Sequence, residues 1–415
     1  MLPSDCPEYK HYLKTLISKI EHHQVATKKV ENYKMSRTTQ DMRTRHAVEA
    51  NLMEEVQITF VTLGSCGSPS LQNARRFDVV VVDEAAQSTE PSTLIALRLG
   101  GKHAVLVGDP MQLPATIFDQ EGGRKGGYDR SMFERLEEGG CEVNMLDTQY
   151  RMRTEISKFP REEFYGGKLV DGKGVDGRKY GGVIFRALKE RCRCLGDMRV
   201  LDFRGQEEKS GMSLVNKGEI DIVVKVLETL GAALGVGNLN DKVGIITPYA
   251  SQVGAIKKRL EMEGSRILQA DTNTVDGFQG REKEIIILSL VRAGEGNGVG
   301  FLEDRRRMNV ALTRPKEMLI IITDVERVGK DKVWGKLFKQ AGEEKRIVRL
   351  GRKVPADLAT LEDPQVVKFE PLEEGEEAGG VKEDVVGLGG IEEKAIDSDE
   401  KVDVYGLGGL DDPAS

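Results

Sequence analysis

The sequence has little of what extracellular and membrane proteins need. It has five cysteines among 415 residues, and no apolar run approaches the roughly 18 residues that cross a membrane. The first residues, MLPSDCPEYKHYLK, lack the apolar middle of a signal peptide. Few, scattered cysteines are typical of a reducing compartment. We therefore expect a soluble intracellular protein with no membrane partner.

One expected motif is absent from the printed sequence. The stretch FDVVVVDEAAQ is an apolar run that ends in Asp83 and Glu84. Such a strand typically presents its acids at a nucleotide site, where the first holds Mg²⁺ and the second acts on water. Its usual partner, the phosphate loop G-x-x-x-x-G-K-[ST], does not occur. A buried strand that merely ends at a polar turn is the alternative interpretation.

The net charge of −7 conceals two oppositely charged parts. From Pro355 onward there are 18 Asp and Glu against 4 Lys and Arg, which leaves the preceding residues with a balance of +7. A body with that excess can hold a polyanion, although evenly spread charge fits it equally well. The acidic tail, residues 351–415, lacks periodicity and is expected to be disordered.

The tail carries a short repeat, DVVGLGGIEE and DVYGLGGLDD. It is either low-complexity drift or a duplicated linear motif for a protein partner.

The rest of the chain divides into two parts with different patterns of apolar and charged residues. Residues 1–55 are charged, with apolar positions at helical spacing, and predict a helical arm. Beyond them, short apolar runs alternate with amphipathic stretches, as in parallel α/β sheets. Two α/β domains are expected, over residues 56–146 and 147–350. Strands are predicted at 58–63, 78–83, 103–109, 198–203, 243–249, 284–291 and 317–324, and helices near 91–99, 130–138, 214–230, 251–263 and 305–313.

Several loops offer side chains suited to a nucleotide. The turn Gly-Asp-Pro would present Gln112, whose amide can orient water or contact a γ-phosphate. Tyr150 offers a flat face for a base and Arg151 a guanidinium fork for phosphate. In TVDGFQGREKEI the glycines allow close backbone approach, and Glu282 could accept a hydrogen bond from a ribose hydroxyl. Arg314 follows a predicted helix. For each arginine alone, a surface ion pair is the simpler interpretation.

In order and spacing these segments resemble one family, the Upf1-like group of superfamily 1 helicases, and most closely its senataxin branch. The matching segments are DEAAQSTEPS, VGDPMQLPAT, QYRMRTEISKFPREEFYGGKL, IITPYASQV, TVDGFQGREKEIIILS and RRRMNVALTR. The resemblance covers roughly residues 56–324. It implies two RecA-like domains of the P-loop NTPase type, with ATP and Mg²⁺ between them, driving 5′ to 3′ translocation along single-stranded RNA or DNA in a nuclear role.

The resemblance also implies roles for individual residues. Asp83 would hold Mg²⁺, Glu84 would activate water, Gln112 would sense the γ-phosphate and Tyr150 would stack on adenine. Arg151 and Arg314 would be arginine fingers, while Gly280 and Glu282 would touch phosphate and ribose. Strand contacts would come from Thr62, Pro248, Tyr249 and Thr274, each of which could equally be a turn or capping residue. With aromatics at 5%, recognition should be nearly sequence-neutral.

The sequence departs from the family at its phosphate loop. In the family this loop precedes DEAA by hundreds of residues, and this chain begins too late to contain it. We therefore expect an incomplete first domain, with an unpaired sheet edge and an exposed apolar face, in a fragment of a longer enzyme or a truncated gene model. The competing hypothesis is a helicase-derived scaffold that binds nucleic acid or protein and hydrolyses nothing. A P-loop kinase or GTPase would leave QYRM and NVALTR unexplained.

Overall fold

The computed structural model describes residue 53 and residues 56–72, 76–117, 120–175, 192, 194–234, 239–263, 269–296, 298–358 and 361. The chain divides into two compact units, residues 1–374 and 375–415. The predictions for the helical arm, apart from residue 53, and for the acidic tail from residue 362 onward lie outside the described residues. Within the first unit we call residues 56–146 the first lobe and residues 147–350 the second lobe.

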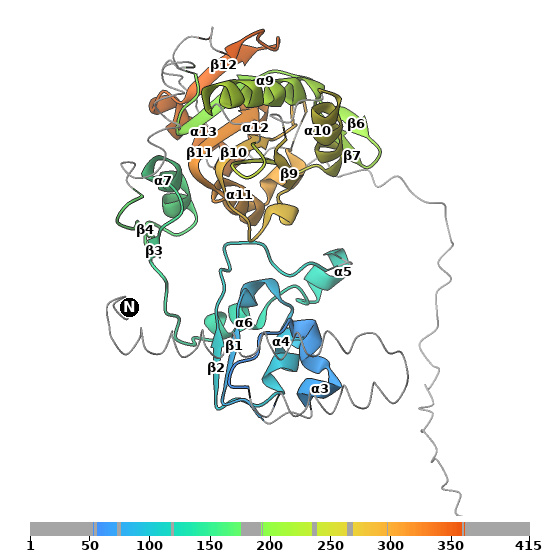
Figure 1. The fold of residues 1–415 in the computed structure, drawn as a ribbon, viewed down its shortest axis with the longest axis vertical. Helices are drawn as coiled ribbons and strands as arrows, with labels where there is room; N and C mark the ends of the chain where they lie inside the picture. Colours follow the sequence, from blue (N-terminus) through green and yellow to red (C-terminus); the bar gives the residue numbers. More distant parts are fainter. Residues whose placement is uncertain are drawn as a thin grey trace, which may run out of the picture. The chain divides into compact units, whose positions relative to one another are not determined.

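The second lobe is built on a six-stranded parallel sheet in the order β12-β5-β11-β10-β8-β9 (Figure 1). Its strands are β5 (Met198–Phe203), β8 (Val243–Thr247), β9 (Asp271–Thr274), β10 (Lys283–Ser289), β11 (Pro315–Thr323) and β12 (Ile347–Gly351). The central strands β10 and β11 read KEIIILS and PKEMLIIIT, and both are almost wholly buried. Uninterrupted apolar runs of this kind are expected where helices cover both faces of a parallel sheet.

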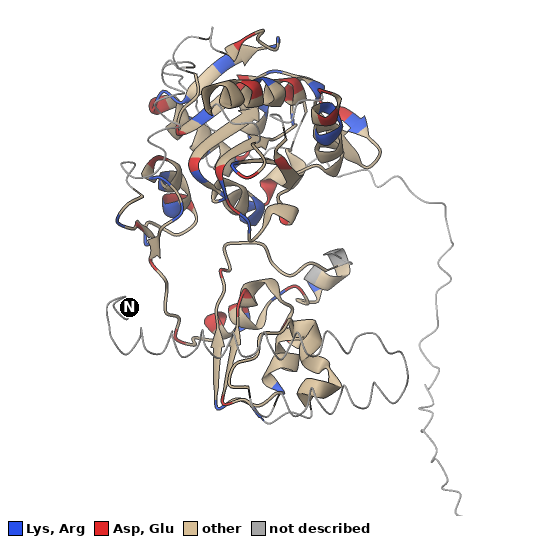
Figure 2. Ribbon diagram, viewed as in Figure 1, with Lys and Arg blue, Asp and Glu red and all other residues tan. Residues whose placement is uncertain are grey.

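Alternate residues of the strands point into two separate cores. Ile285 and Ile287 of β10 join a cluster with helices α9 and α10, whereas Ile286 and Leu288 join one with α7, α11 and α13. The side-chain period of two along a strand therefore places one helical layer on each face. The helices of this lobe are α7 (Thr154–Glu163), α9 (Lys217–Leu234), α10 (Ala250–Met262), α11 (Arg305–Leu312), α12 (Val325–Val328) and α13 (Lys332–Glu343). Figure 2 shows that the charged residues of this lobe gather on these helices and on loops around the largely uncharged strands.

Smaller elements complete the second lobe. Its short strands are β3 (Thr148–Gln149), β4 (Val170–Asp171), β6 (Glu208–Ser210) and β7 (Ser213–Val215), and its 3₁₀ turns are η4 (Asp276–Phe278) and η5 (Gly300–Glu303). Strands β3 and β4 pair in parallel, and β6 and β7 form a hairpin.

The first lobe has a two-stranded parallel sheet of β1 (Val79–Val82) and β2 (His103–Leu106). Its other elements are η1 (Leu63–Gly67), α3 (Pro69–Gln72), η2 (Ala85–Gln87), α4 (Glu90–Leu97), α5 (Gln120–Lys125) and α6 (Met132–Glu138). A small core forms around Cys66, Leu71, Val82 and Ala96. Val81 is 62% exposed, and Val79 and Val105 are also exposed, so this sheet presents an apolar face to solvent, as the sequence predicted.

The fold class is confirmed as α/β with a parallel sheet, and most predicted elements occur. The strand expected at residues 58–63 is wrong, because residues 58–62 form no strand and η1 begins at Leu63. In that run Phe60 is 93% exposed, so the segment lacks the burial that would stabilise a strand. None of the described helices is long and apolar enough to cross a membrane.

Candidate functional site

Asp83 and Glu84 lie at the carboxyl end of β1, as predicted. Both are exposed, and Glu84 has a left-handed backbone with a φ of 53°. Such a conformation costs free energy in a residue other than glycine, and it is common at functional sites. Partial burial and the neighbouring Asp83 raise the pKa of Glu84, while Arg314 of the second lobe acts in the opposite direction. Arg314 is therefore close enough to influence Glu84.

The turn after β2 is packed directly against these acids. The Ala85 amide donates to the Val107 carbonyl over 2.7 Å. A Cβ built on Gly108 would lie 2.7 Å from the Ala86 nitrogen, so only glycine permits this approach. The Asp-Glu turn and the Gly-Asp-Pro turn are thus fixed against each other at one edge of the sheet.

Gln112 lies on that second turn and is held from both sides. Its Nε2 donates to Oδ2 of Asp109 over 2.8 Å, and its Oε1 accepts from Nη2 of Arg314 over 3.1 Å. Asp109 also accepts from the Met111 amide over 2.9 Å, which shapes the turn. The predicted γ-phosphate sensor therefore contacts one of the two predicted arginine fingers directly.

Arg314 lies between α11 and β11, and only 2% of it is exposed. Its Nε donates to the Val310 carbonyl over 3.0 Å. Burial, with Arg151 nearby, lowers the pKa of Arg314 to about 10, so it remains charged at neutral pH. A buried guanidinium beside a second one creates a strongly positive point, which suits a multiply charged anion.

Arg151 forms an ion pair with a second predicted residue. Its Nε lies 2.6 Å from Oε2 of Glu282, and its Nη1 donates to the Thr313 carbonyl over 3.1 Å. Glu282 also pairs with Lys316 at 2.6 Å, and hydrogen bonds from Lys316 and then Arg151 lower the pKa of Glu282. The ion pair that was the simpler interpretation does form, and it links two of the predicted site residues.

The Gln149 side chain forms hydrogen bonds with the backbone of the turn that carries Tyr150 and Arg151. Its Oε1 accepts from the amides of Arg151 and Met152 over 2.9 and 2.8 Å. Its Nε2 donates to Oδ1 of Asp171 over 2.6 Å and to the Met152 carbonyl. Neither Gln149 nor Asp171 was a predicted site residue, although Gln149 belongs to the QYRM motif.

Tyr150 is 55% exposed, as a base platform needs to be. A Cβ built on Gly172, the residue after β4, would lie 2.2 Å from Cε1 of Tyr150. The ring therefore rests directly on the Gly172 backbone. Gly280 is exposed and has a φ of 71°, so glycine is favoured there as well. Among the described residues, no hydrogen bond joins Gly280 to Tyr150.

The four predicted strand-contacting residues fall into two groups. Thr247 and Thr274 are neighbours across β8 and β9, so Pro248, Tyr249 and Thr274 lie at one edge of the sheet. Tyr249 is 5% exposed and packs edge to face on Phe301, with ring centroids 6.0 Å apart. Its ring is therefore not offered for stacking.

The remaining strand candidates are hydroxyl residues. Thr62 is exposed in the first lobe, where Oγ1 donates to Ser65. Oγ1 of Thr274 accepts from the Gly277 amide over 3.1 Å, which is the turn role left open above. No contact described in the structure joins Thr62 to the group at β8 and β9.

Comparisons with known proteins identify the relatives of this chain. Two family models, each described as an AAA domain, match residues 8–120 and 128–326. Probable helicase MAGATAMA 3 of Arabidopsis thaliana is 38% identical over 313 residues, 74% of this chain and 37% of that protein. Helicase sen1 of Schizosaccharomyces pombe is 33% identical over 80% of this chain and 20% of that protein. A regulator of nonsense transcripts 1 homolog of Drosophila melanogaster is 36% identical over 73% and 25%.

The chain belongs to the Upf1-like helicases of superfamily 1. The sen1 relatives place it in the senataxin branch of that family. This helicase-family chain spans between 20% and 37% of the length of the three relatives described above. The solved structure of PRRSV helicase matches with a TM-score of 0.32 and 14% identity, over 67% of this chain and 45% of that one, which is too low for residue comparison.

Besides Gln149 and Asp171, sequence reasoning missed three residues that the structure adds to the site of this helicase-family chain. The Tyr165 hydroxyl donates to Oδ2 of Asp109 over 2.7 Å, and Asn309 Nδ2 donates to the Tyr165 oxygen over 2.9 Å. All three lie inside matched segments, but they are 56 and 144 residues apart, so their spacing carries no signal of contact.

Proposed function

We propose that the chain is part of an ATP-dependent helicase that moves along single-stranded RNA or DNA. The observation that carries the proposal is the hydrogen bond from Arg314 to Gln112, with Glu84 close enough to influence the same arginine. Acids and a glutamine amide come from the first lobe, and guanidinium groups come from the second. If both lobes bind one triphosphate, its hydrolysis would allow the lobes to separate. Each such opening would then move the chain one step along the strand.

The residues present fit the metal and γ-phosphate end of MgATP. Asp83 would hold Mg²⁺ through its exposed carboxylate, and Glu84 would accept a proton from the attacking water. Among the described residues no three His, Cys, Asp or Glu side chains gather into a metal site, so the metal would rely on phosphate oxygens as well. Bound ATP supplies the phosphoanhydride bond whose hydrolysis drives movement. Gln112, Arg151 and Arg314 would orient and neutralise the γ-phosphate, Glu282 and Gly280 would approach ribose and phosphate, and Tyr150 would stack on adenine.

Further parts of the proposal come from the family resemblance. Movement from 5′ to 3′, RNA or DNA as the bound strand and a nuclear location are what the resemblance of the motifs to the Upf1-like family implies. Thr62, Pro248, Tyr249 and Thr274 remain candidates for strand contacts through backbone and hydroxyl groups, and the GLGG repeat for a protein partner.

A second candidate function is a nucleic-acid-binding scaffold that does not hydrolyse ATP. It is favoured by one observation, that no G-x-x-x-x-G-K-[ST] occurs in the printed sequence. That loop supplies the amides and lysine that cradle the β- and γ-phosphates.

Two measurements on the purified chain test these candidates. Filter binding with single-stranded RNA should show affinity that falls steeply with salt, and a flat response would argue against strand binding. ATPase assays with RNA should give no turnover above background, because the phosphate cradle is missing; robust turnover would refute that reason. If an in-frame phosphate loop is encoded upstream of Met1, the extended chain should hydrolyse ATP, and Arg314→Ala should lower turnover about 10³-fold. An extended chain that stays inactive would favour the scaffold.

A further inference from the structure

The two lobes meet through a group of side chains that were not among the predicted site residues. Tyr165, on the turn after α7, donates to Oδ2 of Asp109 over 2.7 Å. Asn309 of α11 uses its Nδ2 twice, donating to the Tyr165 oxygen and to the Met111 carbonyl, each over 2.9 Å. Asp109 and Met111 belong to the first lobe, and Tyr165 and Asn309 belong to the second.

This group is continuous with the candidate nucleotide site. Oδ2 of Asp109 accepts from Tyr165 and from Nε2 of Gln112, and Oε1 of Gln112 accepts from Arg314. Asn309 and Arg314 lie on and just after the same helix, α11. The Tyr165 hydroxyl therefore lies where the turn that carries Gln112 meets the helix that leads to Arg314.

The surroundings make these hydrogen bonds strong. Asn309 is fully buried, so its two donations are made away from water, and its Oδ1 has no partner among the described residues. Burial, and then the Asp109 carboxylate, raise the pKa of Tyr165, which keeps the hydroxyl protonated as a donor. A hydrogen bond to a charged acceptor in such a setting outweighs an exposed ion pair. A further contact between the lobes through α11, from Arg306 to Glu134, is a partly exposed pair of that weaker kind.

We propose that Tyr165 is a positioning residue that couples closure of the lobes to the placement of Gln112 and Arg314. Tyr165 acts through Asp109, which accepts a hydrogen bond from Gln112, and through Asn309 of the helix that leads to Arg314. The coupling to ATP rests on the proposed function, whereas the contact itself does not. Because the ring packs against the core of the second lobe, Tyr165→Phe removes the hydroxyl and leaves that packing in place.

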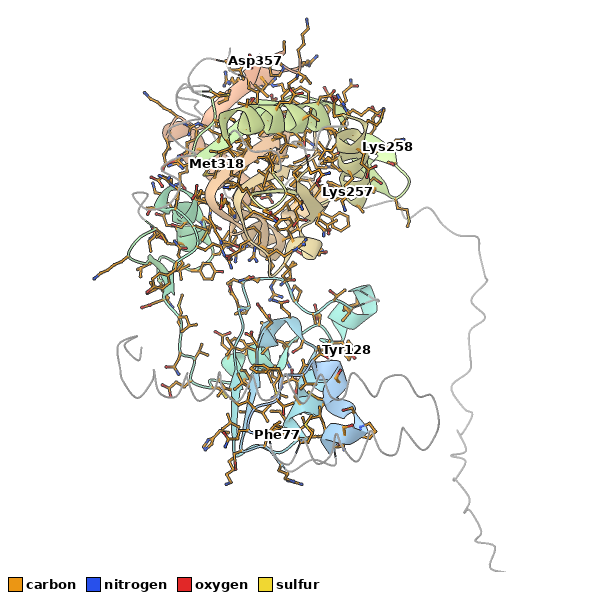
Figure 3. All side chains as sticks on the ribbon, viewed as in Figure 1. Phe77, Tyr128, Lys257, Lys258, Met318 and Asp357 are labelled. Carbon is orange, nitrogen blue, oxygen red and sulfur yellow. The ribbon has the colours of Figure 1, made fainter. Side chains whose placement is uncertain are left out.

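The separation of the lobes can be measured by single-molecule energy transfer on the full chain. Cys141 is an exposed cysteine of the first lobe, and Met212, in the hairpin of the second lobe, is fully exposed. Dyes at Cys141 and at an introduced Met212→Cys, with Cys6→Ser, would report lobe separation. Tyr128→Phe is the matched control, because Tyr128 is an exposed first-lobe tyrosine outside this group (Figure 3).

Without nucleotide, Tyr165→Phe should lower the ratio of closed to open molecules about ten-fold while the melting temperature stays near that of Tyr128→Phe. Asn309→Asp, which keeps the shape but loses both donations, should open the lobes as well. If Tyr165→Phe and Tyr128→Phe give the same ratio, the proposal is wrong. A fall in melting temperature with an unchanged ratio would assign Tyr165 a purely structural role, and would also overturn it.

A non-hydrolysable ATP analogue with single-stranded RNA separates this proposal from the proposed function. If the analogue closes the wild-type chain and Tyr165→Phe weakens that response, both stand. If the analogue has no effect but Tyr165→Phe still opens the lobes, the positioning role stands and the scaffold that does not hydrolyse ATP is favoured for this chain.

Discussion

At the scale of single residues, the site depends on backbone positions where a side chain cannot be added. Gly172 is buried beneath the Tyr150 ring, with a built Cβ only 2.2 Å from Cε1. Its backbone amide donates to the Gln149 carbonyl over 2.8 Å, which ties it to the same turn. A methyl group there must displace the ring.

We predict that Gly172→Ala weakens the binding of adenine nucleotides at least five-fold, since a displaced ring loses most of its stacking on the base. Titration with a fluorescent ATP analogue measures this. Gly254→Ala is the control, because a Cβ at Gly254 in helix α10 meets nothing within 4 Å. Equal affinities for the two variants would show that Tyr150 is not the platform.

A second residue, Glu219, affects the stability of the fold through its ionisation. Glu219 of α9 is fully buried, accepts from Oγ of Ser289 over 2.6 Å and accepts twice from the Val291 amide. Val291 has a φ of 71°, so this carboxyl group holds a strained backbone just beyond β10. Burial raises the pKa of Glu219 from 4.5 to about 8.

The raised pKa makes stability depend on pH in a definite direction. Between pH 4.5 and 8 the folded chain holds a proton on Glu219 that the unfolded chain has released, so the free energy of unfolding falls as pH rises. Glu219→Gln stays neutral and keeps the hydrogen-bonding shape. From pH 5.5 to 7.5, urea denaturation should show the variant gaining about 2 kcal/mol relative to wild type. Glu228→Gln, on the exposed side of the same helix, should show no such gain; equal behaviour of the two variants would contradict the prediction.

At the scale of elements, the sequence predicted several of the buried strands and helices correctly. Strands β5, β8, β10 and β11 occur within one or two residues of their predicted starts, because apolar runs covered by helices on both sides leave little freedom. The predicted helix at 305–313 begins after Asp304, whose side chain accepts from the amides of Arg306 and Arg307, and it ends before Pro315 opens β11.

The elements that were predicted wrongly or not at all have weak local sequence patterns. Residues 58–62 have the composition of a strand but remain exposed, whereas β12, reading IVRLG, was not predicted although it completes the edge of the main sheet beside β5. Partners distant in sequence decide such segments. The same holds for the site: its motif residues were predicted from their order in the chain, but the contacts of Tyr165 and Gln149 depend on side-chain geometry that one sequence does not encode locally.

At the scale of the whole molecule, charge is divided along the chain. Residues 362–415 hold 17 Asp and Glu against 4 Lys and Arg, so removing them changes the net charge from −7 to +6. Leu358 is buried in the core of the second lobe, which sets the limit of a deletion that leaves that core intact. The remaining body carries the excess of positive charge that a polyanion needs.

We predict that removal of residues 362–415 tightens binding to single-stranded RNA about three- to ten-fold at 50 mM salt, because an acidic segment competes with phosphates for the same basic groups. The difference should vanish near 0.5 M salt, where screening reduces the range of both interactions to a few ångströms. A full-length variant with the tail acids changed to Asn and Gln keeps the length of the tail and removes its negative charge. If that variant binds like the deletion, charge is responsible. If the deletion and the wild type bind equally at every salt concentration, the tail does not act on the strand site, and its role lies with a separate partner.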